Sequence, residues 1–271
     1  MVKLADMPRH RYAIRLVYGG APFRGFQRQP GLPTVQEALQ AGLSACGIDA
    51  GLAVAARTDA DVHALAQVVS FSTSRDVSPD VLRRELNQAL PPTILCLEVR
   101  RVPRAFHARA SAGSRRYVYL VGTPAPEGLG AYAWSLPDPR AFPALGPRPL
   151  DVEAMRGTLA AAVGRHDFAG FARPGAQTET VRELHRADVV ASDAHPLVAF
   201  VLEGSGFLRA MVRNLVGTAV TVGLGLAPAS TIGDLLLRRE RYRGVRAPGW
   251  GLTLAAVEYP PALWSPEREA G

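Results

Sequence analysis

A short polar segment carries the side chains best suited to chemistry. Two apolar stretches, 52–56 and 66–72, have the character of buried strands, and this segment separates them. It reads Arg57-Thr58-Asp59-Ala60-Asp61-Val62-His63. A carboxylate at such a place can act as a nucleophile, as an acid or base, or as a metal ligand. In an ordinary turn the same aspartates only accept hydrogen bonds from backbone N–H groups.

A metal site is one interpretation of this segment. Asp61 and His63, with Asp59, place carboxylate and imidazole groups at alternating positions, from which they can converge on a divalent ion. No matching Glu/His set accompanies them, and a metal-dependent phosphodiesterase needs more ligands. The other interpretation is a catalytic Asp59 that stays ionised because Arg57 or another guanidinium lies nearby.

The charge of the chain favours a partner rich in phosphate. Thirty-one Lys and Arg residues exceed 24 Asp and Glu residues among 271, which gives a net charge of +7 and a pI near 10.0. Lys3 is the sole lysine, so guanidinium groups carry nearly all of the positive charge. A G+C-rich genome explains the same arginine usage equally well. Arginines concentrate in two stretches, 100–116 and 238–246, which could follow an RNA backbone or simply be solvated.

The remaining composition excludes several classes of protein. Hydrophobic residues make up 48% of the chain and charged residues 20%, so it is predicted to fold into a compact globular protein. Only Cys46 and Cys96 are cysteines, which argues against a disulfide framework or a structural zinc site and fits a reducing cytosol. Residues 1–16 lack the long apolar run of a signal peptide, and no apolar run is long enough to span a membrane, so we expect a protein that is neither secreted nor membrane-spanning.

Hydrophobic periodicity predicts two α+β halves with similar element order. Each half contains a split βαβ, or ferredoxin-like, unit in the order strand, helix, strand, strand, helix, strand. The first half is predicted at 12–18, 34–46, 52–56, 66–72, 78–90 and 94–102. The second is predicted at 116–121, 152–163, 184–191, 197–202, 207–224 and 252–257, with an extra helix at 229–238.

We expect the domains to divide at residue 105, into 1–105 and 106–271. The stretch 123–149 is rich in proline and glycine, so it is predicted to be a long surface loop without fold elements. Helix 207–224 would place Arg209 and Arg213, four residues apart, on one face.

Several motifs together resemble the TruA family of tRNA pseudouridine synthases. The segment beginning Arg57-Thr58-Asp59-Ala60 is similar to the family signature R-T-D-A-G-V-H, and other matches follow in the same order over nearly the whole chain. They are Tyr18-Gly19-Gly20 through Gln29, Thr34-Val35-Gln36-Glu37, Phe106-His107-Ala108-Arg109, Arg115-Arg116-Tyr117-Val118-Tyr119, His166-Asp167-Phe168, Phe207 through Gly217, and Ala247-Pro248 with Gly251-Leu252.

The resemblance implies a role for each of five residues. Asp59 would be the aspartate that acts, as nucleophile or acid–base group, in breaking the C1′–N1 bond of uridine, without a metal or an organic cofactor. Tyr117 would lie against the target base, and Arg213 would pair with the catalytic aspartate. Arg57 would hold the position vacated by the flipped base or the phosphate beside it. Leu252 would contact the uracil; the alternative is an ordinary leucine of the strand core.

The resemblance also implies a fold and a substrate. The fold would be that of a pseudouridine synthase, with two ferredoxin-like halves, a central, mainly antiparallel sheet, and a basic cleft where Asp59 faces Tyr117 and Arg213. The enzyme would be a cytoplasmic homodimer that modifies positions 38, 39 and 40 in the anticodon arm of tRNA. The chain departs from the family at Ala56 and Asp61, where glycines are usual. Glycine at position 61 would suit a positive φ, and aspartate there adds a negative charge that repels phosphate.

Two other classes of function remain open from the sequence. A non-catalytic RNA-binding protein could keep the cleft while Asp61 spoils the chemistry, and the metal site above would belong to a hydrolase. Turnover, its sensitivity to chelators and the effect of removing the Asp59 carboxylate separate the three.

Overall fold

A computed structural model describes residues 10–146, 148–173, 179–238 and 244–264. The chain forms two compact units. Residues 10–113 and 254–264 make up the first unit, and residues 114–253, in their described parts, make up the second. The sequence-based division into domains 1–105 and 106–271 stays a prediction about which segments fold independently.

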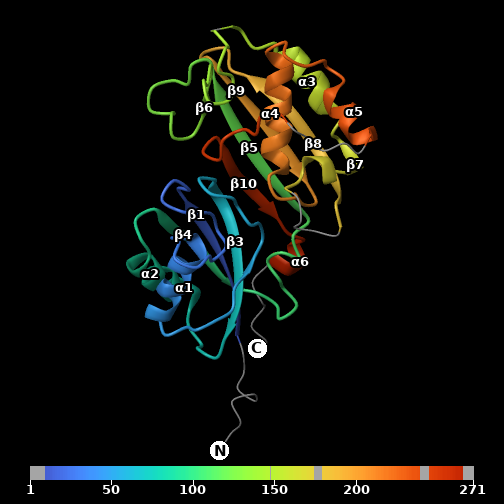
Figure 1. Cartoon of the computed structure of the whole chain (residues 1–271). Helices are drawn as coiled ribbons and strands as arrows, with labels where there is room; N and C mark the ends of the chain where they lie inside the picture. The colour runs from blue at the N-terminus through green and yellow to red at the C-terminus, as the bar shows by residue number, and fades with distance from the viewer. Residues whose placement is uncertain (1–9, 147, 174–178, 239–243, 265–271) are drawn as a thin grey trace, which may run out of the picture. The chain divides into compact units, whose positions relative to one another are not determined.

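The first unit has the predicted ferredoxin-like order (Figure 1). Its sheet has the strand order β4-β1-β3, with the short β2 also on β3, and every one of these pairings is antiparallel. The elements are β1 (His10–Tyr18), α1 (Val35–Ala45), β2 (Ala53–Val54), β3 (His63–Thr73), α2 (Pro79–Ala89) and β4 (Ile94–Arg101).

The helices of this unit begin where their capping residues predict. The Thr34 hydroxyl accepts a hydrogen bond from the Glu37 N–H at 3.3 Å, which satisfies one unpaired donor at the start of α1. Pro79 occupies the first turn of α2, where its missing N–H costs nothing. Both helices lie against one face of the sheet (Figure 1). Ile14 and Leu16 of β1 are fully buried. No helix in the described ranges is long and apolar enough to cross a membrane.

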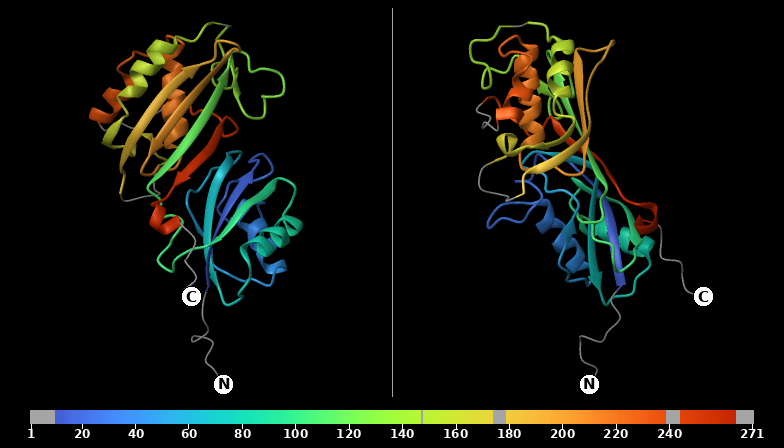
Figure 2. Two further views of the ribbon diagram at one scale, coloured as in Figure 1. Left: turned by 180° about the vertical axis from the view of Figure 1, so that it is seen from behind. Right: turned by 90° about the vertical axis from the view of Figure 1, so that its right-hand side faces the viewer.

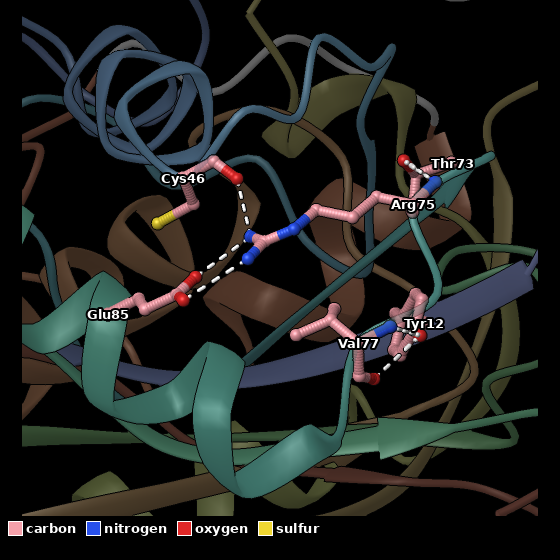
Figure 3. Close-up of polar contacts among 6 residues, drawn as sticks. All are labelled: Tyr12, Cys46, Thr73, Arg75, Val77 and Glu85. Atoms are coloured by element: carbon pink, nitrogen blue, oxygen red, sulfur yellow. Dashed lines mark hydrogen bonds and ion pairs between the residues drawn. The ribbon is translucent and has the colours of Figure 1, made fainter.

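A polar clamp holds the connection between β3 and α2 (Figure 3). The Arg75 guanidinium donates to both oxygens of Glu85 in α2, at 2.8 and 3.1 Å, and to the Cys46 carbonyl at the end of α1. The Tyr12 hydroxyl donates to the Val77 carbonyl at 2.8 Å and accepts from the Val77 N–H at 3.1 Å. Arg75 thus joins the end of α1 to α2. A cation at the carboxyl end of a helix also interacts favourably with the helix dipole.

The second unit repeats this arrangement with additions. Its sheet has the order β5-β9-β8-β7, all antiparallel, and β6 pairs with β5 in parallel. Helices α3 and α4 lie on one face of this sheet (Figure 2). The mainly antiparallel α+β class predicted from the sequence is therefore confirmed. The elements are β5 (Ser114–Gly122), β6 (Trp134–Ser135), α3 (Val152–Ala160), β7 (Gly164–Asp167), the 3-10 turn η2 (Ala169–Phe171), β8 (Val181–Ala191), β9 (Leu197–Gly204), α4 (Met211–Gly223) and α5 (Thr231–Arg238).

The last strand, β10 (Leu252–Glu258), carries the chain out of the second unit and back into the first. In the first unit it is followed by α6 (Pro261–Trp264), whose Trp264 ring stacks on Tyr259 at 5.0 Å. The Gly113 N–H donates to the Glu258 carbonyl at 2.8 Å, so the start of the linker and the returning segment are held together.

The start of helix α4 differs from the prediction. The helix begins at Met211 and not at residue 207, because Ala210 adopts the left-handed conformation, with φ of 66°, and caps it. Arg209 therefore lies before the helix, and the prediction that Arg209 and Arg213 share a helix face is wrong.

The long loop 123–149 also differs from its prediction as a surface excursion. Trp134 is fully buried, stacks on Phe142 at 6.0 Å, and donates from Nε1 to Asp138 at 3.0 Å. Residues Trp134 and Ser135 form strand β6. The proline- and glycine-rich composition concealed this small core, because a few buried aromatic residues leave no periodic pattern.

Candidate active site

Asp59 lies in the connection between β2 and β3, at the first position of a tight turn. The Val62 N–H donates to the Asp59 carbonyl at 3.3 Å and closes the turn. Asp61, at the third position, has a φ of 66°, the left-handed region that favours glycine. Asp61, at the position where the resemblance leads us to expect glycine, thus adopts a conformation that favours glycine, at a cost that is lower for Asp than for most residues. The Asp59 side chain is half-buried, and Arg57 is exposed.

Two glycines of the segment 18–29 lie directly against this turn. A Cβ on Gly20 would be 2.4 Å from the Val62 carbonyl oxygen, and one on Gly25 would be 2.8 Å from the Thr58 oxygen. Contacts this short exclude any larger residue without a backbone shift. Gly25 also has a φ of 95°, which glycine adopts without strain. The segment that resembles the family's first loop therefore packs backbone to backbone on the Asp59 turn.

Hydrogen bonds fix this packing. The Phe26 N–H donates to the Thr58 carbonyl at 3.1 Å, and the carbonyl of Gly25 accepts from Val35 at the start of α1 at 3.2 Å. The Gly20 N–H donates to Nδ1 of His63 at 3.0 Å, and the imidazole is 5% exposed. Three motifs that are separate in the sequence thus meet at Asp59.

These contacts bear on the metal interpretation. One ring nitrogen of His63 already accepts a backbone hydrogen bond. In the part of the chain that the structure describes, no group of three or more His, Cys, Asp or Glu residues is arranged to hold a metal ion. The aspartate segment is built around backbone contacts with its neighbours.

Tyr117 lies in β5 of the second unit. Its side chain is 6% exposed, and its ring meets the edge of Phe207 at 5.2 Å with an interplanar angle of 86°. The β5–β9 register places it opposite Leu202. An edge-to-face pair of this kind fixes the ring plane, so Tyr117 has a defined orientation.

Arg213 is held at the beginning of α4. Its Nε donates to the Ala247 carbonyl at 2.7 Å, and its own carbonyl accepts from the Ala247 N–H at 3.2 Å. A Cβ on Gly217, one turn further along, would lie 1.9 Å from the Val245 oxygen. The segment 245–247 therefore runs along α4 in close contact, which only glycine at position 217 permits, and it orients the Arg213 side chain.

Leu252 begins β10 and is 5% exposed. The preceding Gly251 lies against the ring of Tyr119, where a Cβ would be 2.5 Å from the nearest ring carbon. The Tyr119 hydroxyl donates to the Pro248 carbonyl at 2.9 Å, and burial raises the pKa of this phenol well above its usual range. The Gly-Leu element is thus fixed against β5, and a contact between Leu252 and uracil stays a prediction.

The predicted site residues are divided between the two units. Asp59 and Arg57 belong to the first, and Tyr117, Arg213 and Leu252 belong to the second. Their predicted roles stay predictions. Of the arginine stretch 238–246, residues 239–243 lie outside the described residues.

Sequence reasoning missed one polar residue near Asp59. Gln67 is 0% exposed in β3 and hydrogen bonds to Ala56 and Tyr18. A signal for it was present, because Gln67 is the one amide in the otherwise apolar stretch from 64 to 69. A buried amide needs partners, so such a residue can be identified as structurally constrained.

Comparison with known proteins identifies the family. A family model described as tRNA pseudouridine synthase matches residues 159–260. The chain is 38% identical over 261 residues to tRNA pseudouridine synthase A of Bordetella petrii, covering 93% of this chain and 92% of that protein. It is 39% identical to tRNA pseudouridine synthase A of Methylacidiphilum infernorum, covering 92% and 96% of the two chains. Among solved structures, an archaeal box H/ACA Nop10–Cbf5 complex matches with a TM-score of 0.34 and 12% identity, over 93% of this chain and 49% of that one. The chain belongs to the tRNA pseudouridine synthase A family, a family of isomerases.

Proposed function

We propose that this protein converts uridine to pseudouridine in tRNA and that Asp59 is its catalytic carboxylate. One observation carries the proposal: Gly20, Gly25 and His63, from segments that resemble the family motifs, pack on the turn that holds Asp59. Such packing limits the movement of the backbone that carries the carboxylate, as expected where a reacting group must be held in position. Family membership supports the activity.

The proposed reaction is an isomerisation with no net gain or loss of atoms or electrons. The C1′–N1 bond of uridine breaks, the uracil turns, and a C1′–C5 bond forms. The proton on C5 leaves, and N1 gains a proton. No electrons enter or leave, and an aspartate can serve as nucleophile or proton acceptor, so we propose that the enzyme works without a cofactor or metal.

Four further residues would act on the same nucleotide. We propose that Tyr117 stacks on the target uracil, since stacking on an aromatic ring contributes about 1–3 kcal/mol per base. Arg213 would pair with the Asp59 carboxylate. Arg57 would hold the phosphate or the position that the base leaves when it flips out of its stack, and Leu252 would contact the uracil.

The substrate would be the anticodon arm of tRNA, at positions 38, 39 and 40, and the enzyme would be a cytoplasmic homodimer. Substrates test the positions: anticodon arms with a single uridine at 38, 39 or 40 should each be modified, and an arm with uridine only at another stem position should not be. Size-exclusion chromatography with light scattering tests the dimer.

Release of tritium from tRNA labelled with [5-³H]uridine tests the activity. We expect turnover that EDTA does not affect, and no turnover with Asp59→Ala or Asp59→Asn. The isosteric asparagine keeps the size of the side chain, so its loss of turnover would be due to the carboxylate itself. An Asp59→Asn variant that releases tritium at the wild-type rate would refute the role of Asp59.

The same assay distinguishes the alternatives. Binding of tRNA without tritium release would indicate an RNA-binding protein. Cleavage of the strand that EDTA stops would indicate a metal-dependent hydrolase.

A further inference from the structure

Gln67 connects three segments of the first unit through its side-chain amide. Its Nε2 donates to the Ala56 carbonyl at 2.7 Å and to the Tyr18 hydroxyl at 3.2 Å. Its Oε1 accepts from the Ala56 N–H at 3.3 Å and from the Val68 N–H at 3.2 Å. A single amide thus binds both backbone groups of Ala56, as a neighbouring strand would.

These bonds continue the pairing of β2 toward Asp59. Val54 of β2 pairs with Val69 of β3, and the Ala55 N–H donates to the Val68 carbonyl at 2.9 Å. At Ala56, the side-chain amide of Gln67 replaces the backbone as the partner. The backbone conformation is therefore fixed as far as Ala56, three residues before Asp59.

Thr58, the residue before Asp59, is fixed by the same network. Its hydroxyl forms a hydrogen bond of 2.8 Å with the Tyr18 hydroxyl, which in turn accepts from Gln67. Its carbonyl accepts from the Phe26 N–H. The hydroxyl and the carbonyl of Thr58 thus have partners that come from another segment of the chain.

The network is closed to water. Gln67 is 0% exposed, Tyr18 is 2% exposed and Thr58 is 7% exposed. Burial raises the pKa of the Tyr18 phenol to about 12, although its hydrogen bonds with Thr58 and Gln67 act in the opposite direction, so the phenol stays neutral. Buried polar groups cannot exchange a lost partner for solvent, so the arrangement of this network is strongly determined.

We propose that Gln67 is a positioning residue for Asp59. It acts through Ala56 and, by way of Tyr18, through Thr58, and it touches no part of the reacting nucleotide. The proposal rests on the proposed function, in which Asp59 is the catalytic carboxylate. Loss of the amide would leave the carboxylate present but displaced.

Substitution Gln67→Met keeps the length of the side chain and removes its four hydrogen bonds. We expect kcat to fall roughly 10- to 100-fold, since small displacements of a reacting group have effects of this size. The KM for tRNA should change by less than about threefold, because loss of an interaction made in the transition state lowers kcat with little effect on KM.

Asn87 provides a matched control in the same unit. Its side-chain amide donates to the Cys96 carbonyl at 2.9 Å and accepts from the Cys96 N–H at 2.8 Å, so it also binds both backbone groups of one residue. Asn87→Leu removes these two bonds between α2 and β4 without altering a residue of the network. It should lower the thermal midpoint and leave kcat unchanged.

A second variant gives a readout that loss of stability alone would not produce. In Gln67→Glu, the neutral acid can still donate to the Ala56 carbonyl, but the ionised form only accepts hydrogen bonds. The nearby titratable group from β1 is the Tyr18 phenol, whose pKa of about 12 keeps it protonated at neutral and acidic pH. The ratio of mutant to wild-type kcat should therefore rise as pH falls, whereas for Gln67→Met it should stay constant.

The outcomes separate this inference from the proposed function. If Gln67→Met folds and its kcat matches that of Asn87→Leu, the positioning role is wrong, while Asp59→Asn still decides the role of the carboxylate. If Asp59→Asn is active, the proposed site itself is wrong. Should Gln67→Met fail to fold, Tyr18→Phe, which removes the hydroxyl between Gln67 and Thr58, must lower kcat with little change in KM; unchanged kcat would overturn the proposal.

Discussion

The two units place their predicted site residues beside backbone strain of the same kind but differ in the residue that bears it. Asp61 follows Asp59 by two residues, and Ala210 precedes Arg213 by three; both have a φ of 66°, and they are the non-glycine residues with positive φ in the described chain. Hydrogen bonds from Gly20 and Phe26, together with the close packing of Gly20 and Gly25, hold the Asp59 turn. Close backbone packing on Gly217 holds the segment beside Arg213.

The difference concerns which residue bears the strain. Aspartate tolerates the left-handed region, whereas alanine there costs roughly 1 kcal/mol or more. Ala210 is buried and caps α4, so its conformation is imposed by the packing around it. In the first unit the turn residue suits its conformation, and in the second the surrounding structure imposes the conformation on the residue.

The largest effect on stability should come from overpacking the close backbone contact in the second unit. Gly217→Ala would place a Cβ 1.9 Å from the Val245 oxygen, and the backbone segment that binds Arg213 would have to move. We expect about 3 kcal/mol of lost stability in urea unfolding, at the upper end for overpacking. Gly157→Ala in α3, where a Cβ meets nothing within 4 Å, is the control and should stabilise by about 0.5–1 kcal/mol. Equal midpoints for the two variants would contradict the packing described here.

Tyr117 tests whether the second unit supplies a ring to the substrate. Tyr117→Ala removes the edge-to-face contact with Phe207 and any stacking on a base, so tRNA binding should weaken by about 1–3 kcal/mol. Tyr117→Phe retains the ring and should keep most of the affinity. Filter binding and single-turnover kinetics measure both variants, and similar losses in the two would show that the hydroxyl matters and not the ring.

Glycine at the two strained positions should sharpen the comparison. Ala210→Gly should raise the free energy of unfolding by about 1 kcal/mol, because the left-handed penalty disappears, and Asp61→Gly by only a few tenths. Asp61→Gly should also hold or raise turnover near neutral pH, since in the proposed function it removes a negative charge that would repel phosphate. A large fall in turnover would reveal a positive role for Asp61.

Removing the carboxylate of an ion pair in each unit should have the smallest effect on stability, and this effect depends on pH. Burial alone would raise the pKa of Glu203, but hydrogen bonds from Arg116 and Ser114 outweigh burial and lower it. The hydrogen bonds from Arg75 likewise lower the pKa of Glu85. A carboxylate whose pKa is lower in the folded state stabilises the protein above its unfolded pKa, near 4.5, and this contribution disappears as pH falls through the folded value.

Thermal unfolding of Glu203→Gln and Glu85→Gln between pH 7 and about pH 3 measures this contribution. The difference in midpoint from wild type should be largest near neutrality and should shrink in acid. Glu85 is about twice as exposed as Glu203, at 34% against 17%, so its difference should be smaller because solvent screens it more. A difference that grows in acid would contradict the sign.

Local signals account for what the sequence predicted. Thr34 and Pro79 marked the helix starts, strand periodicity predicted the element order, and the polar segment singled out Asp59, whose catalytic role stays a prediction. The start of α4 was missed because nothing in an alanine codes for positive φ; tertiary packing imposes it. The network around Gln67 was missed because one of its partners, Tyr18, lies 49 positions away in the sequence.

The return of the chain through β10 has a consequence for the order in which the two units can fold during synthesis. The ribosome releases residues 114–253 in one uninterrupted stretch, so the second unit can fold before synthesis of the chain ends. The enclosing unit, although it starts first, must wait for residues 254–264, including the Tyr259 hydroxyl that binds the Ala108 carbonyl and the Trp264 ring beneath Arg15 and Arg100. A stop codon just before Leu254 would therefore damage the half of the protein that was translated earliest, and with it the surroundings of Asp59.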